Sequence, residues 1–180
     1  MGKPKRDADS VIRTSRPVAK AKRDKRAAGA LVPGRAKAGL FGISEVLGGE
    51  KVLHKRIENR LDLIEVASKG LTKLAFLNLA KFLQFSTKQL ADVLPITDRT
   101  IQRYGEKAHF SPVVSDHILQ IAEVSAKGTE VFKDKGKFIL WMSHPCVSFA
   151  NKTPKSLLKS KFGVDMILDE LGRIEHGVFS

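Results

Sequence analysis

Residues 86–105 read STKQLADVLPITDRTIQRYG, and this stretch predicts two short helices joined by a tight turn. Ser86 is a preferred N-cap residue, and Gln89 three positions later completes a capping box. Pro95 interrupts the first helix, and Thr97 caps a second one. Two short helices with a turn of three or four residues are the pattern of a helix-turn-helix.

The residue types of this stretch divide into an inward and an outward set. The apolar set predicted to face inward is Leu90, Ala91, Ile96 and Ile101. The polar set predicted to face DNA is Thr87, Arg99, Thr100, Gln102 and Arg103. A glutamine can make two hydrogen bonds to adenine, an arginine can bind guanine or phosphate, and threonines near helix N-termini can bind phosphates. The alternative is an ordinary helical hairpin inside a core, and Pro95 departs from the glycine that such turns often carry.

The rest of the chain also reads as helix, so we predict an all-α fold. Apolar spacing and cap residues predict helices that start at Ser44, cover about 59–69, run from Thr72 to about 85, from 112 to about 133, around 138–142, from Thr153 onward, and over about 164–176. A minor extended piece near 50–54 remains open. Trp141 fits either a binding platform or, at helical spacing with Phe138, a core position, and the core position is favoured.

The positive charge of the chain is concentrated at its N-terminal end. The net charge is +13, and residues 1–40 hold 12 Lys and Arg against 3 Asp and Glu. This segment lacks a sustained apolar period, so we predict a disordered basic arm. Its KAKRDKR run at 20–26 fits a nucleic-acid-binding patch or a solubilising tail. The rest of the chain is only mildly basic.

Several classes of protein are disfavoured by the composition. The single cysteine, Cys146, excludes an intramolecular disulfide and fits a reducing, cytoplasmic location. No apolar segment follows the basic start as a secretory signal would require, and none is long enough to span a membrane. The histidines and Cys146 lack a metal-ligand spacing, so neither a metal nor a cofactor is expected. No nucleophile with a base and no phosphate-binding glycine motif is evident, so an enzyme is not expected.

The last ten residues, LGRIEHGVFS at 171–180, form a second informative stretch. Leu171, Ile174 and Val178 lie on one helical face, from which Arg173, Glu175 and His176 are predicted to point away. This ending resembles that of the Xre–MbcA–ParS antitoxin family. The resemblance extends upstream through Ser111-Pro112, Glu130-Val131-Phe132, Trp141, Asn151-x-Thr153-Pro154-x-x-Leu157-Leu158 and Gly163 with Ile167-Leu168.

The resemblance implies three parts: a basic arm at 1–40, a helix-turn-helix domain at 41–106, and a toxin-binding domain at 107–180. It implies a type II antitoxin that neutralises a RES-domain, NAD-consuming toxin or a related ADP-ribosyltransferase-like toxin. It also implies operator binding, probably the best-known form of autorepression in such operons being avoided here as a separate assumption: the expectation is simply that the chain represses its own operon. A homodimer is expected, because a helix-turn-helix reads half-sites through a two-fold axis.

The residues expected to contact the toxin are Arg173, Glu175, His176, Val178, Phe179 and Ser180. They would cover the entrance to the toxin's active site, with the carboxylates taking the place of substrate phosphates and Arg173 pairing to the rim. The alternative is that Ile174 and Val178 pack into the chain's own core and the tail merely follows. For the whole chain, the alternative function is a stand-alone helix-turn-helix regulator.

Overall fold

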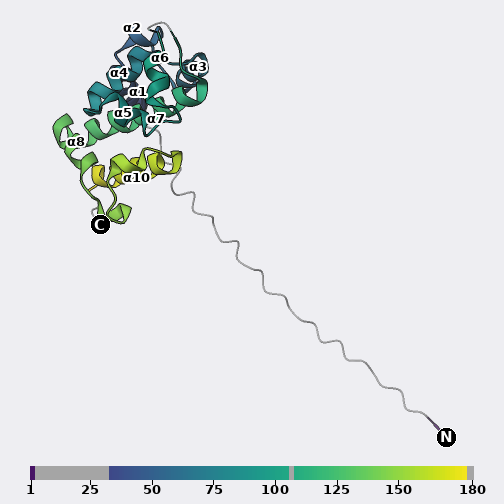
Figure 1. Ribbon diagram of the computed structural model, residues 1–180. Coiled ribbons are helices and arrows are strands. Elements are labelled where there is room, and N and C mark those ends of the chain that lie inside the picture. Colours follow the sequence, from purple (N-terminus) through teal and green to yellow (C-terminus); the bar gives the residue numbers. More distant parts are fainter. Residues whose placement is uncertain (3–32, 106–107, 178–180) are drawn as a thin grey trace. The chain divides into compact units, whose positions relative to one another are not determined.

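The computed structural model describes residues 1–2, 33–105 and 108–177, and Figure 1 shows it as a ribbon. Residues 31–180 group into one compact unit, and residues 1–30 group into another. The description below concerns the first of these, residues 31–180. Most of the predicted basic arm lies outside the described residues, so its disorder and its binding role stay predictions.

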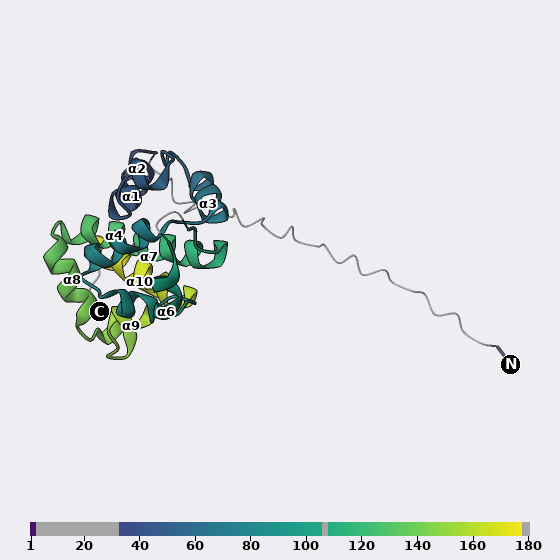
Figure 2. The same cartoon turned by 45° about the horizontal axis from the view of Figure 1, so that its top comes forward.

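Helix α7, at Pro112–Phe132, is the element against which most other helices pack. It contacts α1 (Pro33–Val46), α3 (Arg60–Lys69), α4 (Lys73–Leu83), α8 (Lys135–Ser143) and α10 (Lys161–Glu175). Figures 1 and 2 show these helices arranged around it. The remaining elements are α2 (Glu50–Leu53), α5 (Thr87–Ala91), α6 (Asp98–Arg103), the short 3-10 helix η1 (Val147–Phe149) and α9 (Pro154–Leu157). The described residues contain no strand, which confirms the predicted all-α fold.

Most predicted helix starts are confirmed by hydrogen bonds at the caps. The Ser86 hydroxyl accepts from the Gln89 N–H at 3.1 Å, and the Gln89 side chain accepts from the Ser86 N–H at 3.0 Å. Thr72 and Thr97 accept from the N–H groups three residues later in α4 and α6. Such caps satisfy backbone donors that have no partner within the helix. Short helices therefore begin where the sequence placed them.

Helix α7 is buried on more than one side because it lies between two groups of helices. Its buried residues are Val114, Ser115, Ile118, Leu119, Ile121, Ala122, Val124, Ser125, Ala126 and Gly128. The Ser115 hydroxyl satisfies itself by accepting from the Leu71 N–H at 2.8 Å and donating to the Phe110 carbonyl at 3.5 Å. The predicted boundary at residue 106 stays a prediction, and the helices on both sides of it share α7.

Three glycines allow the helices around α7 to approach closely. A Cβ at Gly42 would lie 3.0 Å from the Cβ of Ala126, where α1 meets α7. A Cβ at Gly128 would overlap the ring of Phe138 from α8, and a Cβ at Gly163 would overlap the carbonyl of Leu157 next to α10. Each glycine thus has a packing reason within the chain.

The N-terminal part of the fold differs from the prediction in two places. Helix α1 begins at Pro33 and runs through Ser44, which is buried in it and is not a cap. Leu40, Ile43 and Leu47 supply the buried face at i, i+3 and i+7, so the helix starts well before the apolar composition does. The extended piece considered near residues 50–54 is also wrong, because Glu50–Leu53 form α2.

The C-terminal part corrects the predicted start of the last helix. Helix α10 begins at Lys161, because the Ser160 hydroxyl accepts from the Gly163 N–H at 3.1 Å and caps it. The predicted start at about residue 164 followed the first buried apolar residue and missed this cap. Trp141 is half-buried against the core, with its ring centroid 5.6 Å from that of Phe132. The core interpretation of this tryptophan is confirmed.

Ion pairs fasten α3 to its neighbours. Arg60 lies 2.9 Å from Glu123 on α7, and the ammonium group of Lys55 bonds both Asp62 and Glu65. These hydrogen bonds from Lys55 hold the pKa of the two carboxyls below their usual values. Both acids are therefore kept in the charged form that the α3 contacts need.

We predict that Gly128→Ala destabilises the fold, because the ring of Phe138 is fully buried and has no space to move aside. The expected loss in the free energy of unfolding is about 1–3 kcal/mol, measured by urea denaturation. The matched control is Gly172→Ala in α10, where an added Cβ would meet nothing within 4 Å. That change should leave stability unchanged or raise it by up to about 1 kcal/mol, because alanine favours helix. Equal effects at both positions would contradict the packing argument.

Candidate functional site

The first candidate site is the pair of helices α5 and α6. Leu90 and Ala91 on α5 and Ile101 on α6 are buried, whereas Ile96 in the turn is half-buried. Helix α5 contacts both α4 and α6, so the buried side chains fix the pair to the core. This division leaves one side of α6 to the solvent.

All five residues predicted to face DNA have exposed positions. They are Thr87, Arg99, Thr100, Gln102 and Arg103. Arg99, Gln102 and Arg103 are spaced i, i+3 and i+4 on α6, so they project from neighbouring positions of the helix. The structure thus brings the α6 residues together, and Thr87 starts the preceding helix. Whether they contact DNA stays a prediction.

Asp98 organises this surface, and the sequence reasoning missed it. Its Oδ2 atom accepts a hydrogen bond of 2.7 Å from the amide nitrogen of Gln102. The other carboxylate oxygen of Asp98 is buried without a hydrogen-bond partner. The available signal was the Asp–Gln spacing of four residues, which allows such a bond on a helix. The amide of Gln102 is therefore oriented by its own helix.

The C-terminal end of α6 is held by a residue from α4. The ammonium group of Lys73 donates to the carbonyl of Tyr104 at 3.1 Å and to that of Gln102 at 3.4 Å. A cation there satisfies carbonyls that lack a helical partner and complements the helix dipole. Next to it lies a hollow of about 340 Å³ lined by Thr100, Arg103, Tyr104, Gly105 and Ala108.

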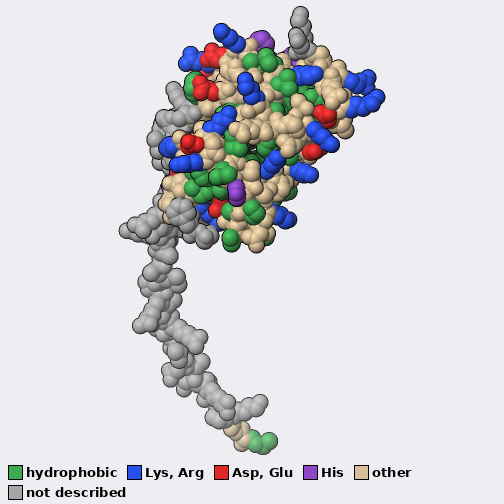
Figure 3. Space-filling view, turned by 60° about the vertical axis from the view of Figure 1, so that its left-hand side comes forward, with side chains coloured by type: hydrophobic (Ala, Val, Ile, Leu, Met, Phe, Trp, Pro, Cys, Tyr) green, Lys and Arg blue, Asp and Glu red, His purple; other side chains and the backbone are tan. Residues whose placement is uncertain are grey.

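Basic side chains do not gather into one continuous patch on the folded unit. On the face seen in Figure 3, Lys and Arg side chains occur in several separate places, with acidic side chains among them. This distribution agrees with the mild charge of residues 41–180, which hold 20 basic and 16 acidic residues. Any contact with a polyanion by this unit therefore depends on particular side chains.

The second candidate site is the C-terminal end of α10. Arg173 and His176 are exposed, and a guanidinium nitrogen of Arg173 lies 3.5 Å from the buried carboxylate of Glu170. The backbone N–H of His176 closes the helix by bonding to the carbonyls of Gly172 and Arg173. Val178, Phe179 and Ser180 lie outside the described residues, so their predicted contacts are untested.

Glu175 does not point away from the body of the protein as the helical spacing suggested. Its carboxylate lies 2.6 Å from the ammonium group of Lys127 on α7, and both side chains are partly buried. Glu170, which lies on the same helix, accepts a 2.9 Å hydrogen bond from Ser148. These contacts join residues far apart in sequence, so helical periodicity alone does not reveal them.

The described residues give no sign of a metal site. No group of three or more His, Cys, Asp or Glu residues in 33–105 and 108–177 is placed to hold an ion. Cys146 is a free, half-buried thiol. No described helix has both the length and the apolar character that crossing a membrane requires.

Two family models match consecutive parts of the chain. Residues 62–123 match the antitoxin Xre-like helix-turn-helix domain, and residues 127–177 match the antitoxin Xre/MbcA/ParS C-terminal toxin-binding domain. The first match runs from α3 into α7 and includes α5 and α6. The second match includes α8 and α10.

Two curated proteins are similar to the chain, and both are described as antitoxin Xre. The protein from Yersinia enterocolitica is 38% identical over 80 residues, which cover 44% of this chain and 54% of the relative. The protein from Photorhabdus laumondii is 30% identical over 105 residues, which cover 56% of this chain and 71% of the relative. The chain therefore spans about half of the Yersinia protein and more than two thirds of the Photorhabdus protein.

We predict that Glu175→Ala weakens the end of α10, because it removes the 2.6 Å contact with the partly buried Lys127. The free energy of unfolding should fall by about 1 kcal/mol, measured by urea denaturation. Arg173→Ala is the matched control, since its side chain is mostly exposed and its contact with Glu170 is long. It should change stability by less than about 0.5 kcal/mol. A neutral Glu175→Ala change would show that the ion pair has no structural role.

Proposed function

The chain belongs to the Xre antitoxin family, with a helix-turn-helix domain followed by a toxin-binding domain, and we propose that it neutralises a cognate toxin and represses its own operon. The observation that carries this proposal is the presence of both domains in one chain, around a shared helix α7. A DNA-binding regulator alone would need only the first domain. The second domain favours the antitoxin over the stand-alone regulator.

The proposed toxin is a RES-domain enzyme that consumes NAD. This choice rests on the resemblance of the chain to the Xre branch, in which a helix-turn-helix precedes the toxin-binding domain. A related ADP-ribosyltransferase-like toxin is the second candidate. The chain itself needs no catalytic group for neutralisation, because covering the substrate entrance is sufficient.

In the proposed mechanism, the C-terminal end of α10 and the residues after it cover the entrance to the toxin's active site. Arg173 and His176 are exposed at this end and are free to contact the rim of the entrance. Val178, Phe179 and Ser180 would follow them into it. Glu175 would contribute chiefly by holding the last turn through Lys127, and any contact of its own with the toxin would compete with that ion pair.

For operator binding, we propose that α6 enters the major groove of DNA. Arg99 and Arg103 would bind guanine or phosphate, and Gln102 would read adenine. Thr87 and Thr100 would bind phosphates and fix the orientation of the helices. A homodimer would place two such helices on successive half-sites. The bond between Asp98 and Gln102 would present the amide in one orientation.

The toxin proposal is tested by expressing the gene next to this one, with and without the full chain. The toxin alone should arrest growth and deplete NAD, and the full chain should restore both. A chain that lacks Val178–Ser180 should lose neutralisation while it keeps its melting temperature, because occlusion requires the tail. Full neutralisation by the shortened chain would contradict occlusion by the tail, and growth arrest without NAD loss would contradict a RES toxin.

The DNA proposal predicts separate effects for the arginines and the glutamine of α6. Binding to the region upstream of the gene is measured by fluorescence anisotropy at several salt concentrations. Arg99→Ala with Arg103→Ala should weaken binding and reduce the slope of affinity against salt, because phosphate contacts release counterions. Gln102→Ala should reduce preference at one base pair by about 1–3 kcal/mol.

Lys161→Ala is the control for charge, because this exposed lysine lies on α10 outside the helix-turn-helix. It should change DNA affinity much less than Arg99→Ala does. Asp98→Asn should alter the same base preference as Gln102→Ala, since it changes the group that orients the amide. Unchanged affinity after loss of both arginines would rule out α6 as the recognition helix.

A further inference from the structure

On the basis of the function proposed above, we propose that the toxin also docks along the outer face of α10. We use this name for the side of the helix that carries Phe162, Met166, Asp169, Arg173 and His176, with Gly172 at its edge. The contact would then extend from the C-terminal turn along the length of the helix. Toxin affinity would come from this face, and the tail would supply the occlusion.

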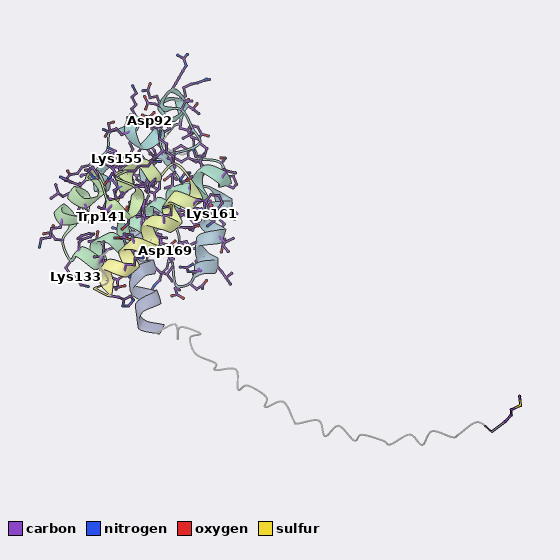
Figure 4. All side chains as sticks on the ribbon, turned by 90° about the horizontal axis from the view of Figure 1, so that it is seen from below. Asp92, Lys133, Trp141, Lys155, Lys161 and Asp169 are labelled. Carbon is purple, nitrogen blue, oxygen red and sulfur yellow. The ribbon has the colours of Figure 1, made fainter. Side chains whose placement is uncertain are left out.

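The outer face of α10 is exposed along its whole length. Phe162 is 83% exposed and Met166 is 45% exposed, although both are large apolar side chains. They are followed at helical spacing by Asp169, Arg173 and His176, which are exposed as well. Figure 4 views the molecule from below, where α10 lies on the near side and Lys161 and Asp169 mark positions along it. No helix of the described residues covers this face.

The opposite side of α10 provides all the packing that the fold needs. Val164, Ile167 and Leu171 are buried there, and α10 contacts α7 and α9. The exposed phenylalanine and methionine are therefore not required for the core. Large aromatic and methionine side chains left at a surface are typical of the centre of a protein interface.

Gly172 supplies an independent observation. Glycine inside a helix costs about 1 kcal/mol relative to alanine, so a reason for its presence is expected. Gly42, Gly128 and Gly163 have such reasons in close contacts with the chain itself. A Cβ at Gly172 would meet nothing within 4 Å. A partner that approaches the backbone closely beside the outer face of α10 would explain why no side chain is present.

The chemistry of this face favours a protein partner and, in particular, the toxin. Asp165 and Asp169 are exposed beside the apolar residues, and these carboxylates disfavour a nucleic acid. The face lies within residues 127–177, which match the toxin-binding domain. It also leads directly to Arg173 and His176 at the end of the helix. A toxin whose entrance is covered by that end lies next to the rest of the face.

The test compares toxin binding by variants of the full chain, with a catalytically inactive toxin as the probe in calorimetry. Phe162→Ala with Met166→Ala should weaken binding about tenfold or more, because both would lie at the interface centre. Gly172→Gln should weaken binding to a similar extent by blocking close approach. Its melting temperature should not fall, because glutamine favours helix and the space is open within the chain.

The matched controls are Leu140→Ala on α8 and Val147→Ala in η1, which are 61% and 78% exposed in the same domain. They should bind the toxin as the unchanged chain does. If the unchanged chain fails to bind the toxin, the proposed function itself is wrong. If that chain binds and the α10 variants bind equally well, only the docking face is wrong. Altered self-association in light scattering with unchanged toxin affinity would assign the face to a second copy and also overturn the proposal.

Discussion

The burial of α7 on several sides is the constraint on which the rest of this structure depends. A helix with Ile118, Ile121, Ala122 and Val124 all removed from water needs neighbours around most of its circumference. Helices α1, α3 and α4 supply one set of neighbours, and α8 and α10 supply another. The helices that precede α7 and those that follow it are therefore parts of one core.

This shared core affects how the two family domains can be separated. The helix-turn-helix match ends at residue 123 and the toxin-binding match begins at 127, so the junction falls inside α7. A chain cut before α7 would leave the side that α1 and α3 cover open to water. Removing that cover exposes apolar area, and each buried aliphatic side chain is worth about 1.5–3 kcal/mol. Experiments on toxin binding are thus best made with the full chain.

Local signals predicted much of this fold, because caps and apolar spacing act over a few residues. Ser86 with Gln89, Thr72 and Thr97 fixed helix starts that the structure confirms. The exposed set on α6 followed from the same spacing. The start of α1 was missed because its first turns lack a strong apolar period. The ion pair of Glu175 with Lys127 and the capping of α6 by Lys73 were missed because they join distant residues.

The capping of α6 by Lys73 has a consequence for how the protein opens. A helix of six residues does not hold itself together in water, so α6 depends on Thr97, on Ile101 and on the lysine from α4. Helix α7 has a much larger buried surface and opens only when the whole core does. The free energy of local opening thus differs between the two helices. Amide protons of α6 exchange through small fluctuations, while those at the centre of α7 report global unfolding, and the DNA-reading surface is the first to lose its shape.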